Sequence, residues 1–204
     1  MDTEVSMLKH LGEDSSKVEQ LINNLETYYL SYPIKKADKR KLRWIDAPLG
    51  DLKSIQYNIL FNCIYKIRPH NAAVGFRVNR SVKTGAERHL GNKTVLTMDI
   101  SNFFNSIKLP NVHRVLCLCA YRALNLNRGI DMQDPKLDPN TVKHVEDTGL
   151  LAQLCCYKSQ LPQGAPTSPA IANLYAMRLD TQLTSFSNKH DLLYTRYADD
   201  MTFS

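Results

Sequence analysis

Residues 192–204 read LLYTRYADDMTFS, and this stretch decides the fold of the chain around it. Apolar, aromatic and β-branched residues flank a central Ala198-Asp199-Asp200, a composition typical of strand, tight turn and strand. The stretch therefore predicts a β-hairpin with two carboxylates at its tip. An aspartate pair in a hairpin is usually turn chemistry alone, so the pair does not by itself define a site.

A further aspartate ends another predicted strand. Residues 94–100, TVLTMDI, are nearly continuous in apolar and β-branched character and predict a buried strand that ends at Asp99. Buried strands rarely end in an acid without a purpose, because an unpaired buried carboxylate is costly. If the two strands are neighbours, Asp99 lies beside the hairpin tip. Carboxylates gathered in this way suit Mg²⁺, and two such ions are the usual device for in-line phosphoryl transfer.

The remaining sequence alternates predicted helices with irregular segments. Residues 42–47 predict a short strand that a turn at 48–50 closes. Helical spacing of apolar residues predicts helices within residues 1–30, 52–67, 111–124, 141–158 and 168–189. Basic, polar or proline-rich composition predicts irregular structure at residues 70–92, 125–139 and 161–169.

The composition is that of an ordinary globular protein. Of 204 residues, 43% are hydrophobic and 23% are charged, which excludes a wholly disordered chain. No apolar run approaches the roughly 18–20 residues that span a bilayer, and the polar residues 1–14 predict no secretory signal. Five cysteines without a C-x-x-C pair, together with scattered histidines, argue against zinc. They predict buried, reduced thiols in a cytoplasmic protein.

Basic residues are concentrated early in the chain, which has a net charge of +6. Residues 35–43 hold six basic residues and one acid. Such residues contact nucleic-acid phosphates without reading sequence, although a charge run is more often simply a solvated face. The residues that we expect to bind nucleic acid are Lys35, Lys39, Arg40, Lys41, Arg77 and Arg80.

Four blocks in a fixed order resemble the reverse transcriptases, most closely their bacterial retron and group II intron branch. The blocks are residues 41–48 with 52–56, similar to the first fingers block; 99–107, similar to motif A; 161–169 with 173–174, similar to motif B; and 194–204, similar to motif C. They cover most of residues 35–204. A lone Tyr-Ala-Asp-Asp would be a weak signal, but four blocks in order are a specific one.

The resemblance implies an α+β fold built as the fingers and palm of a right-hand polymerase. The palm would be an antiparallel sheet backed by helices. Residues 1–92 would form N-terminal helices and fingers, and residues 93–204 the palm, with a helical insertion at about 111–160. Because the sequence stops just after motif C, the resemblance implies that the helical thumb is absent from this chain and that a longer protein continues it.

The resemblance also implies roles for matching residues. Asp99, Asp199 and Asp200 would be catalytic and, with the backbone carbonyl of Ile100, would hold two Mg²⁺ ions, or Mn²⁺ in their place. The residues around the incoming nucleotide would be Lys36, Arg43, Phe104, Gln163 and Gly164. For Gln163 and Gly164, a simple helix-entry loop is the alternative.

Phe104 would be the gate against the ribose 2′-hydroxyl, which favours deoxynucleotides. Strand alternation instead puts Phe103 on the Asp99 face, unless the chain bends after Asp99. Core packing is the alternative for either ring.

The implied activity is that of an RNA-directed DNA polymerase, in retron-type cDNA synthesis or phage defence. Its partners would be an RNA template, a DNA or RNA primer and deoxynucleoside triphosphates, with no membrane and no assigned oligomeric state. An RNA-templated RNA polymerase and a group II intron maturase-type RNA-binding protein remain as alternatives. Retron enzymes usually carry Asn-Ala-x-x-His before motif A, whereas residues 85–89 here read GAERH. We expect residues 1–204 alone to be weak or inactive as a polymerase.

Overall fold

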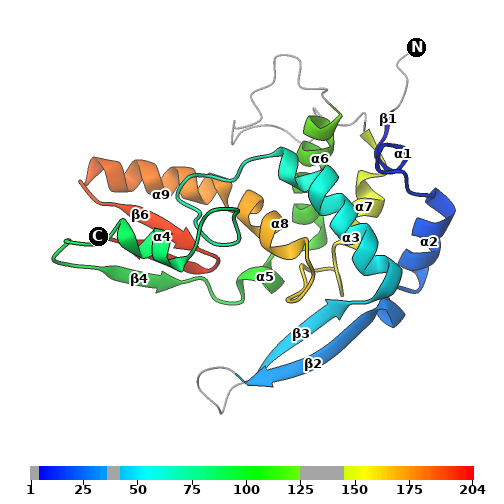
Figure 1. Cartoon of the computed structure of the whole chain (residues 1–204), viewed down its shortest axis with the longest axis horizontal. Coiled ribbons are helices and arrows are strands. Elements are labelled where there is room, and N and C mark those ends of the chain that lie inside the picture. The colour runs from blue at the N-terminus through cyan, green and yellow to red at the C-terminus, as the bar shows by residue number, and fades with distance from the viewer. Residues whose placement is uncertain (1–4, 36–41, 125–144) are drawn as a thin grey trace. The chain divides into compact units, whose positions relative to one another are not determined.

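The computed structural model describes residues 5–35, 42–124 and 145–204 (Figure 1). Helices predominate, and the described strands form one three-stranded antiparallel sheet, one antiparallel pair and one short parallel pair. The expected mixture of helices with antiparallel strands is therefore confirmed.

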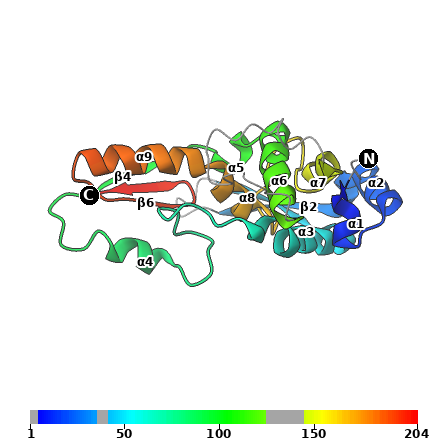
Figure 2. The same cartoon turned by 90° about the horizontal axis from the view of Figure 1, so that it is seen from above.

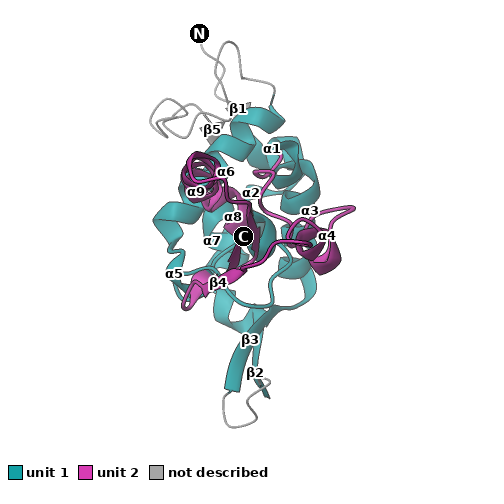
Figure 3. Cartoon of the chain, turned by 90° about the vertical axis from the view of Figure 1, so that its left-hand side faces the viewer, with its two compact units in different colours: residues 1–67, 104–171 teal, residues 68–103, 172–204 magenta. Residues whose placement is uncertain are grey.

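Two compact units divide the chain, and Figure 3 colours them separately. Unit 1 comprises Met1–Ile67 and Phe104–Ile171, and unit 2 comprises Arg68–Phe103 and Ala172–Ser204. Each unit thus combines two stretches that are distant in sequence.

Unit 1 is mainly helical, because apolar residues recur at helical spacing along most of its length. Buried side chains such as Ile59, Leu116 and Leu151 come from three of its helices and form its core. Within the described residues, no helix has the length and apolar character needed to cross a membrane. The helical segments are α1 (Met7–Leu11), α2 (Ser15–Asn23), η1 (Leu25–Tyr28), α3 (Gly50–Asn62), η2 (Ile64–Lys66), α6 (Leu109–Ala123) and α7 (Thr148–Leu154).

The five cysteines are all buried, and none forms a disulfide. Burial raises the pKa of every one of these thiols, because a thiolate would lose its hydration. The prediction of buried, reduced thiols is confirmed.

A two-stranded ribbon belongs to unit 1. β2 (Tyr29–Lys35) pairs antiparallel with β3 (Leu42–Pro48), from Tyr29↔Pro48 to Lys35↔Leu42. β3 was predicted and β2 was not. After Tyr29 every side chain of β2 is exposed, so β2 carries no alternation between a buried and a solvated face.

Unit 2 is built on the three-stranded sheet. Its strands are β4 (Leu96–Asp99), β6 (Tyr194–Tyr197) and β7 (Asp200–Phe203), in the order β4-β7-β6. Helix α9 (Met177–Lys189) runs alongside the sheet in both Figure 1 and Figure 2. Its Leu179 and Leu183 pack against a core that includes Tyr194 and Phe203. The predicted hairpin and the helix that precedes it are confirmed.

β4 is not the buried strand that its composition predicted. Leu96 is 56% exposed and Met98 is 50% exposed, and all four residues of the strand count as exposed. β4 is an outer strand of its sheet, and among the described residues only β7 pairs with it. An apolar run predicts a strand correctly, but it does not reveal which layers cover that strand.

Several helices are shorter than predicted. Helix α3 ends at Asn62, and the predicted helix 168–189 breaks at Ala176 into α8 (Ser168–Tyr175) and α9. Before α7, Asp147 has a positive φ of 68°, which stops the helix from starting earlier. Residues 125–144, which include the predicted loop 125–139, lie outside the described residues.

Two short elements were not predicted. Helix α4 (Val82–Glu87) lies in the stretch that was expected to be irregular. The two-residue strand β5 (Val145–Glu146) pairs in parallel with β1 (Val5–Ser6).

Candidate active site

Three aspartates lie at one end of the unit 2 sheet. Asp99, the last residue of β4, is the register partner of Asp200, the first residue of β7. Residues directly opposite on antiparallel strands have Cβ atoms about 4.5–5.5 Å apart and point to the same face. Asp199 precedes Asp200, and its carbonyl accepts a hydrogen bond of 3.1 Å from the Ile100 N–H. The structure thus brings together the four residues expected to hold metal.

A tight turn carries Asp199. Tyr197 pairs with Asp200, so Ala198 and Asp199 are the two central residues of the hairpin. Ala198 has a φ of +55°, whereas Asp199 is not among the described residues with positive φ. A positive φ at the first central residue alone is the pattern of a type II′ turn, where glycine is usual. Alanine is strained in this conformation, so the surrounding contacts must hold the turn in place.

Asp200 is affected by its burial and by the charges of the two neighbouring aspartates. Partial burial is the largest cause that raises the pKa of Asp200, and the charges of Asp199 and Asp99 raise it further. A cation between the strands would offset these charges. Among the described residues, no three His, Cys, Asp or Glu side chains converge into a ready-made cage.

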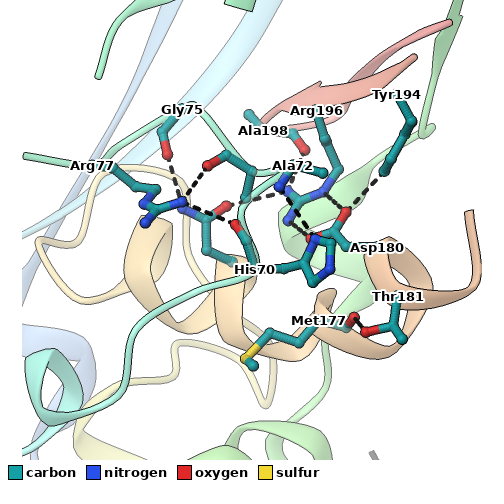
Figure 4. Close-up of polar contacts among 12 residues, drawn as sticks. His70, Ala72, Gly75, Arg77, Met177, Asp180, Thr181, Tyr194, Arg196 and Ala198 are labelled. Carbon is teal, nitrogen blue, oxygen red and sulfur yellow. Dashed lines mark hydrogen bonds and ion pairs between the residues drawn. The ribbon is translucent and has the colours of Figure 1, made fainter. Parts of the chain in front are cut away.

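A buried polar network lies behind the turn (Figure 4). Arg196 of β6 and Asp180 of α9 are both fully buried and form a two-pronged ion pair, with Nε to Oδ1 at 2.8 Å and Nη2 to Oδ2 at 2.7 Å. The Tyr194 hydroxyl donates a third hydrogen bond to Asp180, at 2.8 Å. The remaining Arg196 nitrogen, Nη1, donates to the Ala198 carbonyl at 2.8 Å and to the Asn173 side chain at 3.2 Å.

In unit 1, the loop that contains Gln163 and Gly164 is joined to the ribbon strand β3. The Asp46 N–H donates a 2.7 Å hydrogen bond to the Gln163 carbonyl. Gly164 has a φ of +128°, and a Cβ there would lie 2.7 Å from Ile45 Cγ2 and 3.0 Å from the Asp46 carbonyl. Only glycine fits this close approach. Arg43 is exposed and, by strand alternation, lies on the same face of β3 as Ile45.

The chain bends directly after Asp99. Asn102 has a φ of +51°, and the short helix α5 (Phe103–Ser106) follows it. Phe103 is buried, and the Arg196 guanidinium lies 5.8 Å from its ring centroid, so Phe103 is a core residue of unit 2. Phe104 is half-buried and belongs to unit 1. The bend that a gate at Phe104 requires is present.

The segment that follows Phe104 is hydrogen-bonded to the residues that lead into the loop containing Gln163. Three residues after Phe104, the Ile107 carbonyl accepts a 2.9 Å hydrogen bond from the Leu161 N–H. Within unit 1, the structure therefore joins the segments that carry Phe104, Gln163 and β3.

The residues predicted to bind nucleic acid differ in whether their charged groups are exposed or already engaged within the protein. Lys35 is exposed in β2. Arg77 instead donates from Nη1 to the carbonyls of His70 and Ala73 within its own loop, at 2.9 Å each. Nη1 of Arg80 is buried, with no hydrogen-bond acceptor among the described residues. The expected contacts that lie outside the described residues are Lys36, Lys39, Arg40 and Lys41.

The sequence agrees with this geometry. Residues 34–204 match the family model described as reverse transcriptase (RNA-dependent DNA polymerase). The chain belongs to the reverse transcriptase family. It is similar to the Retron Ec86 reverse transcriptase of Escherichia coli, with 32% identity over 90% of this chain and 51% of the relative. It is also similar to the Retron Mx162 reverse transcriptase of Myxococcus xanthus (34%, 100% and 42%) and to the Retron Ec73 reverse transcriptase of Escherichia coli (37%, 84% and 53%).

The chain spans about half the length of the curated relatives that it matches. Those relatives are all named as retron reverse transcriptases, which supports the retron-type branch expected from the sequence.

One departure of this chain from the usual retron pattern has a steric explanation. Gly85 stands where retron enzymes usually carry asparagine, and a Cβ at this position would lie 2.9 Å from Val74 Cγ2. Any side chain here would force Val74 to shift, so the packing against Val74 favours glycine at this position.

The histidine of the same block, His89, connects separate segments of unit 2 through two hydrogen bonds. His89 is hydrogen-bonded through Nδ1 to the Ser204 hydroxyl at 2.6 Å and through Nε2 to the Thr195 hydroxyl at 2.8 Å. Burial, reinforced by the charge of Arg88, lowers the pKa of His89. The neutral ring therefore joins the segment after α4 to β6 and to Ser204, the residue that follows β7.

The sequence alone does not predict the buried network. The resemblance to motif C assigns no role to Arg196, and no local pattern marks Asp180. One signal was present, because Arg196 interrupts an apolar and aromatic strand that the structure buries. A charged residue at such a position needs a partner, but only the packed structure identifies Asp180 as that partner.

Proposed function

We propose that this chain is the fingers and palm portion of a retron-type RNA-directed DNA polymerase. The observation that carries the proposal is the register of Asp99 opposite Asp200, with Asp199 in the adjoining turn. The membership of residues 34–204 in the reverse transcriptase family supports it. In this proposal the unit 2 sheet is palm and the β2–β3 ribbon is fingers, and the division at residue 92 stays a prediction.

Asp99, Asp199 and Asp200, with the backbone of Ile100, would hold two Mg²⁺ ions. When bound, these ions supply activation of the primer 3′-hydroxyl and stabilisation of the leaving pyrophosphate. The charges of Asp199 and Asp99 contribute to raising the pKa of Asp200, and a bound cation would offset them.

The residues of unit 1 would receive the deoxynucleoside triphosphate. Arg43, exposed on β3, would pair with its phosphates, and Lys36 is proposed for the same role. Gln163 and Gly164 would line the nucleotide on the loop that Asp46 joins to β3. Phe104 would exclude the ribose 2′-hydroxyl. An RNA template and a DNA or RNA primer would contact the exposed basic residues, in retron cDNA synthesis or phage defence.

The decisive test is Asp199→Asn in the full-length protein. We expect primer extension on an RNA template with Mg²⁺ and deoxynucleotides to be abolished, while RNA affinity stays within about twofold, because this carboxylate would bind metal and not template. Asp191→Asn is the matched control, since Asp191 is exposed, precedes β6 and makes the same change of charge away from the turn. Wild-type incorporation by Asp199→Asn would refute the catalytic assignment.

A further inference from the structure

We propose that the buried Arg196–Asp180 pair positions the metal-binding turn. The Arg196 guanidinium would fix the Ala198 carbonyl, and through it the orientation of Asp199 and Asp200. This inference rests on the proposed function, and it assigns a role to two residues that contact neither nucleotide nor primer in that proposal.

The first support is the number of contacts that one guanidinium makes. Nε and Nη2 bind the two oxygens of Asp180, which leaves Nη1 directed away from the ion pair. Nη1 then donates to the Ala198 carbonyl at 2.8 Å. The planar fork of arginine allows this combination, whereas the single nitrogen of lysine cannot form both contacts in the same geometry.

The second support is the position in the turn of the residue that accepts the hydrogen bond from Arg196. Ala198 carries the positive φ of the turn, and its carbonyl group is joined by the peptide bond to Asp199. A non-glycine residue holds such a conformation only when its surroundings enforce it. The hydrogen bond from Arg196 supplies that enforcement within the hairpin itself.

The third support is that the guanidinium is itself held firmly. The Arg196 backbone donates to the Ala72 carbonyl and accepts from the Val74 N–H, both at 2.8 Å. Asn173, which accepts from Nη1, donates in turn to the Gly75 carbonyl at 2.9 Å. A rigid support is what a precise carboxylate geometry requires.

Stability alone does not account for burying such a pair. Removing two charges from water is costly, and apolar residues of similar volume often give equal or greater stability. In the proposed role, the buried pair also holds the turn that carries the two metal-binding carboxylates. Apolar residues of similar volume could not form that hydrogen bond.

The test compares two variants of the full-length protein with one control. Arg196→Lys keeps a cation beside Asp180 but loses the fork. The double variant Arg196→Met with Asp180→Leu removes both charges and so leaves neither one unpaired. Tyr194→Phe is the control, since it deletes a hydrogen bond to the same Asp180 oxygen without touching Ala198. The measurements are Tm, RNA affinity, kcat and KM for deoxynucleotide, and the Mg²⁺ concentration for half-maximal rate.

We expect both variants to require several-fold more Mg²⁺ and to lose about ten- to a hundredfold in kcat, while RNA affinity and KM change little. Tyr194→Phe should lower Tm without changing the Mg²⁺ requirement. The inference is overturned if folded variants keep the wild-type kcat and Mg²⁺ dependence. It is equally overturned if neither variant folds, or if activity in all three proteins simply follows Tm. An active Asp199→Asn protein would instead overturn the proposed function.

Discussion

At the scale of single residues, a bend in the backbone distinguishes two adjacent phenylalanines. Phe103 is 5% exposed beneath the Arg196 guanidinium, and Phe104 is half-buried. Strand alternation would have favoured Phe103 as the gate, but the strand ends at Asp99 and a helix begins at Phe103. Periodicity arguments hold only while the element continues.

Phe104→Ala should weaken sugar selectivity. Removing the ring relieves the clash with a 2′-hydroxyl, so we expect ribonucleotide incorporation relative to deoxynucleotide to rise about ten- to a hundredfold. Single-nucleotide primer extension with each substrate measures this ratio. Phe186→Ala is the control, because Phe186 is an exposed phenylalanine of α9. Unchanged discrimination in a folded Phe104→Ala protein would return the ring to a packing role.

His89 should make the stability of the fold depend on pH. Its pKa lies below the ordinary value of 6.5, so the folded state favours the neutral ring. The stabilising contribution is present above that value and is lost as the pH falls through the lowered pKa of the folded state. His70, whose pKa burial also lowers, acts with the same sign.

We therefore expect Tm to fall between about pH 7 and pH 5 and to fall less in His89→Gln, because that variant removes one of the two titrating groups. Thermal unfolding of both proteins across this range is the measurement. Parallel curves for the two proteins would show that His89 does not contribute.

At the scale of elements, the Gly164 loop and strand β3 behave as one piece of structure. Their contact is backbone against backbone, with the Gln163 carbonyl bound to the Asp46 N–H. A change in the conformation of the loop should therefore alter the position of Arg43, which lies on β3.

Gly164→Ala should destabilise the protein by about 1–3 kcal/mol, because alanine is strained at this φ and its Cβ meets Ile45. We also expect a higher KM for deoxynucleotides. Gly149→Ala is the matched control, since a Cβ there meets nothing within 4 Å and the residue lies in α7. Denaturant unfolding and steady-state kinetics compare the two. Equal stability of both variants would contradict the close approach.

The order of the strands in the unit 2 sheet is likewise a property of whole elements. Among the described residues β7 is the central strand, and β4 and β6 are the two outer strands. Local sequence predicts the hairpin, but the order of strands depends on which distant segment adds to it.

At the scale of the whole molecule, we expect residues 1–204 alone to bind RNA weakly and to extend primers poorly. The basic residues available for binding make mainly electrostatic contacts with phosphates. About four such contacts predict a loss of affinity of roughly 50- to 150-fold between about 50 and 200 mM salt. A loosely held duplex would also lose the alignment on which the rate depends. Filter binding across salt concentrations and primer extension measure these effects, and processive extension at moderate salt would contradict the prediction.

Local sequence determined the elements whose signals are contained in a few residues. The hairpin of β6 and β7 follows from strand formers around a short polar turn, and the helical spacing of apolar residues predicts α3, α6 and α9. The order of four motifs also indicated the reverse transcriptase family, because each motif is a contiguous run of residues that its chemistry requires.

Only the tertiary structure decided which distant residues meet. Arg196 pairs with Asp180 sixteen positions away, His89 reaches Ser204 across 115 positions, and Gly164 packs against Ile45. A charged or polar residue in a buried strand requires a partner, but its own neighbours in sequence do not specify which one. That choice depends on how helices and strands pack together, since packing alone brings separated segments within hydrogen-bond distance.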